Sequence, residues 1–138
     1  LKAAFVGVRR RHTRAHFIRA IMEGVGYVLK AVVEALTENH VALEDIFFVG
    51  GGSRSRLWGR ILADILNREV NVVLRGEDAA NFGAASLAFN ALGTCKVGEF
   101  SRKWVKVMER VKPTPANRGV YEEAYKRFIK LIKHVRGI

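Results

Sequence analysis

One short segment constrains the fold of this chain more than any other. Ile46–Val49 is a fully apolar run, typical of a buried strand, and the glycines Gly50–Gly52 follow it directly. A helical repeat of apolar residues then runs from Leu57 to Leu66, and Val70–Leu74 predicts a second buried strand. A strand, a helix and a strand within this length predict a right-handed βαβ unit with two parallel, adjacent strands.

Other apolar patterns extend this alternation of strands and helices. Ala3–Val8 predicts a further buried strand, and a long helix is predicted over Thr13–Glu38, with a threonine as its N-cap. Gly24 and Gly26 lie inside that helix, where glycine is unfavourable, so we expect another backbone to approach closely there. Ala80–Ala91 predicts a third helix with a face of small residues that should pack unusually close to a neighbour.

The pattern changes in the last third of the chain. A short helix is predicted around Trp104–Val111, two prolines interrupt it, and Asn117 is expected to cap a final amphipathic helix. The sequence contains no internal repeat and no low-complexity tract. We therefore expect one domain over residues 1–138, with 101–138 forming a helical tail of the same unit.

Net charge indicates which classes of partner this chain could bind, and cysteine content indicates its cellular compartment. The 138 residues include 24 Lys and Arg against 13 Asp and Glu, a net charge of +11, which directs attention to phosphorylated ligands, nucleic acid and acidic membranes. The basic residues lack interleaved aromatic side chains, which argues against a nucleic-acid surface. The single cysteine, Cys95, cannot form an internal disulfide and is expected to be an unreactive thiol. The sequence shows no signal peptide and no membrane-spanning segment, so we expect a cytoplasmic chain that binds no membrane.

The glycines after the first βαβ strand could bind an anion. Consecutive glycines between a strand and a helix let the backbone approach a ligand and direct amide donors toward a phosphate. Arg54 and Arg56 add positive charge nearby. The segment matches neither of the two common glycine-rich phosphate patterns, so a tight turn without a ligand remains the alternative.

The remaining polar groups show no catalytic arrangement. His12 and His16 stand four residues apart, a spacing that suits a metal on one helix face, but no third ligand follows them. Among the carboxylates, Asp64 lies on the second predicted helix, and Glu77 with Asp78 suit the first turn of the third. No carboxylate is marked as a general base.

Three ordered segments together resemble the C-terminal half of the FGGY family of carbohydrate kinases, and the xylulokinases are its most similar members. The second segment is VGGGSRSRLWGRILADIL, beginning at Val49, and the third is EDAANFGAASLA, beginning at Glu77. The first segment follows AAFVGV and matches the family at His12, Thr13, Arg14, Ala15, His16, Arg19, Ala20, Glu23 and Gly24. The proline- and tyrosine-containing tail is also similar to the end of many xylulokinases.

The resemblance implies an α/β domain with the ribonuclease-H-like, actin-like ATPase fold. Such a domain is one of two that close on ATP and a sugar, and this chain would form the nucleotide side, with ATP or ADP and Mg²⁺ as cofactors. In the complete enzyme the γ-phosphoryl group would pass to a sugar hydroxyl. The residues that the resemblance places along the phosphates, ribose and adenine are Gly50, Gly51, Gly52, Ser53, Ser55 and Arg56.

The resemblance also implies missing parts. The family's five strands lie in the order three, two, one, four, five, and Ala3–Val8 corresponds to the third, Ile46–Val49 and Val70–Leu74 to the fourth and fifth. The first two strands, the sugar site and the catalytic aspartate would lie outside this chain, so we expect the chain alone to be inactive. The open edge would recruit the remainder of the kinase (its N-terminal domain) or a second copy, or the first strand would shift to close it.

Two other functions are compatible with the sequence. A noncatalytic regulatory or interaction remnant of such a kinase would keep the domain shell and bind another chain. A basic nucleic-acid-binding module would rest on net charge alone, and a steep salt dependence of binding would identify it.

Overall fold

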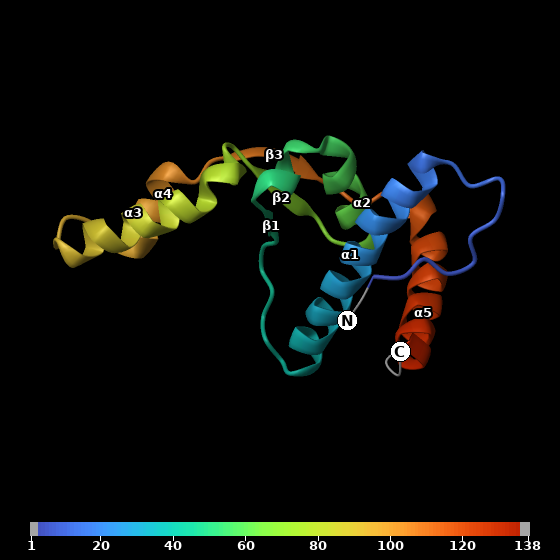
Figure 1. Ribbon diagram of the computed structural model, residues 1–138. Coiled ribbons are helices and arrows are strands. Elements are labelled where there is room, and N and C mark those ends of the chain that lie inside the picture. The colour runs from blue at the N-terminus through green and yellow to red at the C-terminus, as the bar shows by residue number, and fades with distance from the viewer. Residues whose placement is uncertain (1–2, 136–138) are drawn as a thin grey trace.

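The computed structural model describes residues 3–135, in which helices and a small sheet alternate (Figure 1). The helices are α1 (Arg14–Glu38), α2 (Arg56–Leu66), α3 (Ala79–Ala91), α4 (Val97–Trp104) and α5 (Arg118–Val135). The strands are β1 (Phe47–Phe48), β2 (Val70–Val73) and β3 (Val107–Val111). Short 3₁₀ turns precede α2, α3 and α5, at Gly51–Arg54, Gly76–Asp78 and Pro115–Asn117. Among the described residues, no helix is long and apolar enough to cross a bilayer.

The sheet has the order β1-β2-β3, and its first two strands confirm the predicted βαβ unit. β1 runs parallel to β2, with Phe47 opposite Asn71, and α2 connects the two strands. β3 pairs with β2 in the antiparallel direction, with Val111 opposite Val70. Within residues 3–135, the other edge of β1 has no strand beside it.

Side chains that alternate along β1 define the two faces of the sheet. Phe48 contacts Trp58 of α2 edge to face, with ring centroids 5.9 Å apart. Val49, which follows β1, lines a cavity on the other face together with Val73 of β2 and Phe82 of α3. Because successive residues of a strand point to opposite faces, α2 and α3 lie on opposite sides of the sheet.

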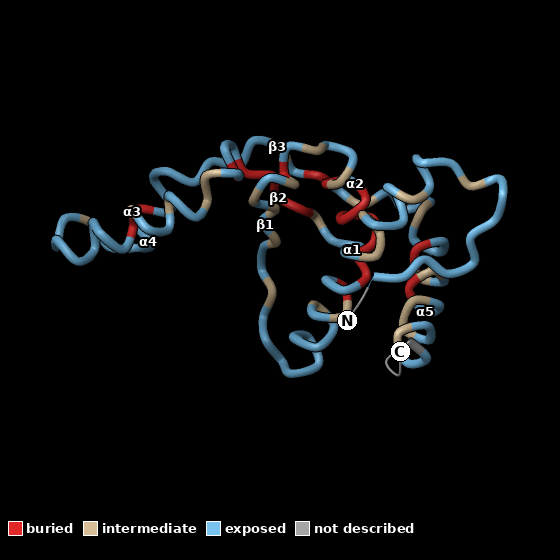
Figure 2. The backbone as a smooth tube through the Cα atoms, in the orientation of Figure 1, coloured by how far each residue is buried: buried red, intermediate tan, exposed pale blue. Residues whose placement is uncertain are grey.

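The core lies on both sides of α2 (Figure 2). On its sheet side, Leu62 and Leu66 pack with apolar residues of β2 and β3. On its other side, Ile61 and Ile65 are 1% exposed and pack with tyrosines of α1 and α5: Tyr27, Tyr121 and Tyr125. Ala63, between the two pairs, is fully buried. α2 is therefore the element on which the sheet and the two long helices both pack.

The prediction of a strand over Ala3–Val8 is wrong. The segment forms no strand and does not join the sheet, and Gly7 adopts a positive φ of 76° that interrupts an extended conformation. Phe5, still 48% exposed, instead contacts Phe17 of α1 with ring centroids 5.1 Å apart. An apolar run becomes a strand only where a neighbouring backbone can pair with it, and the described part of the chain supplies none there.

The prediction of a short helix around Trp104–Val111 is also wrong. The helix, α4, ends at Trp104, and Val107–Val111 forms β3. The free edge of β2 offers backbone donors and acceptors to this segment, and pairing there buries Val111 to 7% exposure. The expected helical tail thus contains a strand. The last helix does begin where it was predicted, directly after Asn117.

We expected close packing at the small residues of α1 and α3, and the structure shows it at one glycine of α1 but not on α3. A Cβ at Gly26 would lie 2.6 Å from Cδ1 of Ile65, so this glycine does allow α2 to approach, through a side chain rather than the backbone. A Cβ at Gly24 would meet nothing within 4 Å. The small-residue face of α3, with Ala80 and Gly83, is exposed and has no close neighbour in the described part of the chain.

The two glycines of α1 should respond oppositely to alanine. We expect Gly24→Ala to raise the free energy of unfolding by about 0.5–1 kcal/mol, because alanine is the better helix former and the space is open. Gly26→Ala should lower it, because the new methyl group would displace Ile65 from the core. Urea denaturation of both variants measures this difference, and equal effects would contradict the packing described for Gly26.

Candidate functional site

The glycine loop follows the carboxyl end of β1, where ligands of open α/β sheets bind. Gly50 has a positive φ of 84°, and its N–H donates to the carbonyl oxygen of Gly76 at 2.7 Å. The amides of Ser53 and Ser55 donate to carbonyls within the loop. The amides of Gly51 and Gly52 have no hydrogen-bond acceptor among the described residues. Two adjacent donors at the start of a turn are thus available to an anion.

The glycines of this loop have different packing roles. A Cβ at Gly52 would lie 2.8 Å from the Trp58 ring and 3.2 Å from that of Phe48, and one at Gly76 would lie 2.7 Å from Oγ of Ser53. A Cβ at Gly51 would meet nothing within 4 Å. Gly52 and Gly76 are therefore required for the packing of the loop, whereas Gly51 faces open space.

The two serines that we placed in the site hold the loop in shape. Ser53 is 6% exposed, and its Oγ donates to the carbonyl oxygen of Gly50 at 2.7 Å. Ser55 is the N-cap of α2, and its Oγ accepts a hydrogen bond from the amide of Trp58 at 3.2 Å. Both hydroxyl groups are thus engaged with the protein.

The arginines of the loop point into solvent. The side chain of Arg54 is 75% exposed and lies 3.6 Å from Glu77, and that of Arg56 is 82% exposed and lies 3.9 Å from Glu109. Exposed ion pairs of this length contribute little to stability. Both guanidinium groups can therefore turn toward an anion at the glycine loop at little energetic cost.

A cavity of about 180 Å³ lies beside the loop, between the carboxyl ends of β1 and β2 and the α3–α4 hairpin. Its lining is mostly apolar and includes Val49, Phe82 and Trp104. It shares Gly76 with the glycine loop, because Gly76 both lines the cavity and accepts from Gly50. The polar donors of the loop and an apolar hollow are therefore adjacent.

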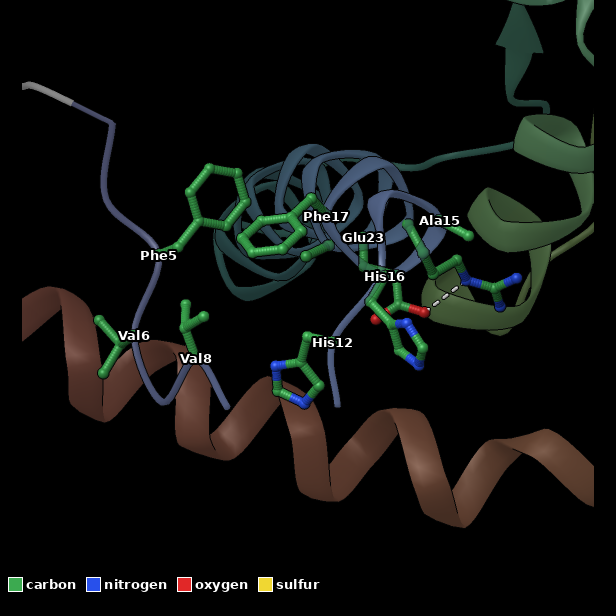
Figure 3. A pocket seen from close by; sticks show the side chains of 10 residues that line it. Phe5, Val6, Val8, His12, Ala15, His16, Phe17 and Glu23 are labelled. Carbon is green, nitrogen blue, oxygen red and sulfur yellow. Dashed lines mark hydrogen bonds and ion pairs between the residues drawn. The ribbon is translucent and has the colours of Figure 1, made fainter. Parts of the chain in front are cut away.

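The histidine pair lies elsewhere, in a hollow between the N-terminal segment and α1 (Figure 3). Nδ1 of His12 accepts from the amide of Arg9 at 3.2 Å, and Nδ1 of His16 accepts from the amide of Thr13 at 3.1 Å. In the neutral rings these bonds assign the proton to Nε2, so neither ring retains a lone pair for a metal. His16 instead closes a capping box with Thr13 at the start of α1.

Asp64 has a structural role that its sequence position did not indicate. The carboxylate is buried at 8% exposure and accepts two hydrogen bonds of 2.7 Å, from the amide of Thr114 and from Nδ2 of Asn117. It therefore fixes the turn before α5 to α2. Both of its oxygens are occupied, so this carboxylate is not placed to act as a general base.

Further polar contacts attach α5 to α1, and the sequence did not predict them. Lys30, 6% exposed, pairs with Glu122 and lies over the ring of Tyr125 at 4.9 Å from its centroid. The hydroxyl of Tyr125 donates to Oε2 of Glu34 at 2.6 Å. Burial and this carboxylate raise the pKa of Tyr125 well above its usual value. Each contact joins residues about ninety positions apart, so no local pattern could have revealed it.

We expect Asp64→Ala to destabilise the chain by roughly 2–3 kcal/mol, because a charged acceptor is lost and two donors remain buried. Glu123→Ala is the matched control, since it removes only an exposed pair with Arg127, and should change stability by less than about 0.5 kcal/mol. Chemical denaturation of both variants provides the comparison. Equal losses would show that Asp64 does not fix the tail.

Comparisons with known proteins identify the family of this chain. The model of the FGGY family of carbohydrate kinases, C-terminal domain, matches residues 1–92. A xylulose kinase of Staphylococcus epidermidis is 31% identical over the whole chain, which spans 28% of that relative's length. The chain is therefore similar to a minor part of a longer kinase.

Solved structures show the same relationship. The xylulose kinase of Rhodospirillum rubrum superposes on 97% of the chain with a TM-score of 0.79 and 29% identity, over 27% of its own length. A xyloylose kinase from Brucella ovis superposes on 99% of the chain with a TM-score of 0.83 and 27% identity, over 28% of its own length. These neighbours support the predicted α/β, actin-like fold class. The chain belongs to the FGGY family of carbohydrate kinases, as a xylulokinase-like C-terminal domain.

Proposed function

We propose that this chain forms the nucleotide side of an ATP-dependent sugar kinase, which transfers the γ-phosphoryl group to a sugar hydroxyl when the enzyme is complete. The observation that carries the proposal is the pair of amides at Gly51 and Gly52, at the carboxyl end of β1, that have no acceptor in the part of the chain that the structure describes. The names of the relatives favour xylulose as the sugar. A cytoplasmic location follows from the same proposal, because ATP is the phosphoryl donor.

Different residues of the loop would bind different parts of ATP or ADP. The amides of Gly51 and Gly52 would donate to phosphate oxygens, with Arg54 and Arg56 adding charge. Ser53 would act indirectly, by keeping Gly50 in its turn. The adjacent apolar cavity would accept the less polar part of the nucleotide.

Mg²⁺ would enter with the nucleotide and neutralise phosphate charge. Among the described residues, no group of three or more His, Cys, Asp and Glu side chains could hold a metal ion. Phosphate oxygens and water molecules would supply most of its ligands, as is usual for magnesium at nucleotide sites.

A noncatalytic interaction role is the second candidate, and one observation favours it. Large apolar side chains of α1 and β1 are exposed, among them Ile21, Val32 and Phe47. A surface of this kind suits association with another polypeptide. It is equally required of a kinase part that packs against the rest of its enzyme, so we retain the kinase function as the primary proposal.

Adenine-nucleotide binding tests the site directly. We expect ADP to bind weakly to the chain, and Gly51→Val to reduce its affinity at least tenfold, because the side chain would occupy the open space at the free amides. Gly119→Val, at an equally open glycine on α5, is the control and should bind like the wild type. Isothermal titration calorimetry measures the ADP affinity of the wild type and of both variants.

Gly51→Val separates ligand binding from folding better than Gly52→Val does. A side chain at Gly52 would collide with Trp58 and disturb the loop even without a ligand. Equal ADP affinities for the wild type and Gly51→Val would remove the glycine loop as the nucleotide site.

The isolated chain should not phosphorylate xylulose. The resemblance places the catalytic aspartate and the sugar site outside these residues, so both proton transfer and substrate positioning would be absent. A coupled assay for ADP release in the presence of ATP, Mg²⁺ and xylulose measures turnover. Activity above a control without the chain would contradict this expectation.

A further inference from the structure

The glycine loop is bonded to a second turn that lies outside it. This turn, residues 75–78, follows β2 and precedes α3, and it is here named the brace turn. The carbonyl oxygen of Gly76 accepts from the amide of Gly50 at 2.7 Å. The carbonyl oxygen of Gly50 accepts from the amide and the hydroxyl group of Ser53, within the glycine loop. The bond between Gly50 and Gly76 therefore connects the loop, with its own internal bonds, to the end of β2.

The two turns pack closely at Gly76. A Cβ at this position would lie 2.7 Å from Oγ of Ser53 and 3.4 Å from the carbonyl oxygen of Phe48. The Gly76 carbonyl also accepts from the amide of Ala79, so the brace turn fixes its direction. A change in the backbone angles of the brace turn would therefore move the acceptor of the Gly50 amide.

The brace turn begins with a residue in an unfavourable conformation. Arg75 has a φ of 55° and a ψ of 38°, in the left-handed region that residues with a Cβ rarely adopt. Among the described residues other than glycine, His40 and Asn67 also have a positive φ, and both are types that occur in this region several times more often than most. Arginine is not such a type, so an interaction of its side chain is expected to offset the strain.

The side chain of Arg75 makes that interaction with Asp78, at the other end of the brace turn. Nε and Nη2 of Arg75 donate to Oδ2 of Asp78 at 3.0 and 2.7 Å. The amide of Asp78 donates to the carbonyl oxygen of Arg75 at 2.9 Å. Asp78 stands at the N-cap position of α3, but within residues 3–135 its side chain makes no capping bond to the helix. Its carboxylate therefore holds the turn before α3 closed.

We propose that Asp78 is a positioning residue for nucleotide binding. Its ion pair keeps Arg75 in the left-handed conformation, and this conformation directs the Gly76 carbonyl toward the glycine loop. The loop then presents its amides to the phosphates, although the Asp78 carboxylate itself does not touch the nucleotide. The inference rests on the proposed function, because it assumes that the glycine loop binds ATP or ADP.

The exposure of the ion pair sets the size of the expected effect. The side chain of Arg75 is 69% exposed and that of Asp78 is 30% exposed. Ion pairs with this exposure contribute modestly, so loss of the carboxylate should weaken ADP binding about threefold to fivefold rather than abolish it. A direct contact of Asp78 with Mg²⁺ or with the phosphates is the alternative that the experiment must distinguish.

A second-site substitution makes this distinction. Asp78→Ala removes the partner of Arg75, and we expect it to lower the affinity for ADP, measured by isothermal titration calorimetry in the presence of Mg²⁺. Adding Arg75→Gly to this variant should restore most of the affinity, because glycine adopts a positive φ without strain and no longer needs the carboxylate. A carboxylate that bound the ligand or its metal directly would not be replaced in this way.

Hydrogen exchange at the Gly50 amide tests the same contacts without a ligand. We expect this amide to exchange about threefold to fivefold faster in Asp78→Ala than in the wild type, because its bond to Gly76 opens more often. The double variant should return it close to the wild-type rate. Glu123→Ala is the matched control, since it removes a similarly exposed ion pair with Arg127 inside α5, and it should alter neither measurement.

Two results would overturn the inference alone: a Gly50 amide that exchanges at the same rate in Asp78→Ala and the wild type, or a loss of ADP affinity that persists in the double variant. The second result would assign Asp78 to the ligand or its Mg²⁺. Absence of ADP binding by the wild type would instead overturn the proposed function, and the nucleotide role of Asp78 with it.

Discussion

The burial of α2 on both sides is the constraint on which the rest of the structure depends. Leu62 and Leu66 hold the sheet, and Ile61 and Ile65 hold the long helices, so one eleven-residue helix joins two clusters of the core. Close packing makes such a helix intolerant of rotation, because turning either pair outward would expose apolar surface. The position of α2 in turn sets the direction of the chain that enters it.

Contacts with α2 fix the conformation of the glycine loop. Trp58, in the first turn of α2, contacts Phe48 and occupies the space beside Gly52, and Ser55 caps the same turn. Gly52, one of the two residues whose amides lack an acceptor among the described residues, is therefore held by packing against Trp58 and Phe48 as well as by the loop's own bonds. A binding group supported in this way is preorganised, which lowers the entropy lost when a ligand binds.

The sequence predicted those parts of the fold whose partners lie nearby in the chain. The parallel pair Ile46–Val49 and Val70–Leu74 was predicted because strand, helix and strand are consecutive and all present. Ala3–Val8 was mispredicted because its apolar pattern indicates burial, whereas residues 3–135 supply no strand beside it. The loop could be located from its glycines, but the burial of Ser53 could not, because it depends on Gly76 approaching from another turn.

The contacts between α5 and α1 have a consequence for where this domain ends. The family model stops at residue 92, yet Lys30, inside the matched region, is buried against Glu122 and Tyr125, outside it. A polypeptide cut at residue 92 would leave this ammonium group without its counterion and would remove the α5 tyrosines that cover Ile61 and Ile65. The unit defined by the family model is thus smaller than the unit that packs around one core, and expression boundaries drawn from that model would divide the core.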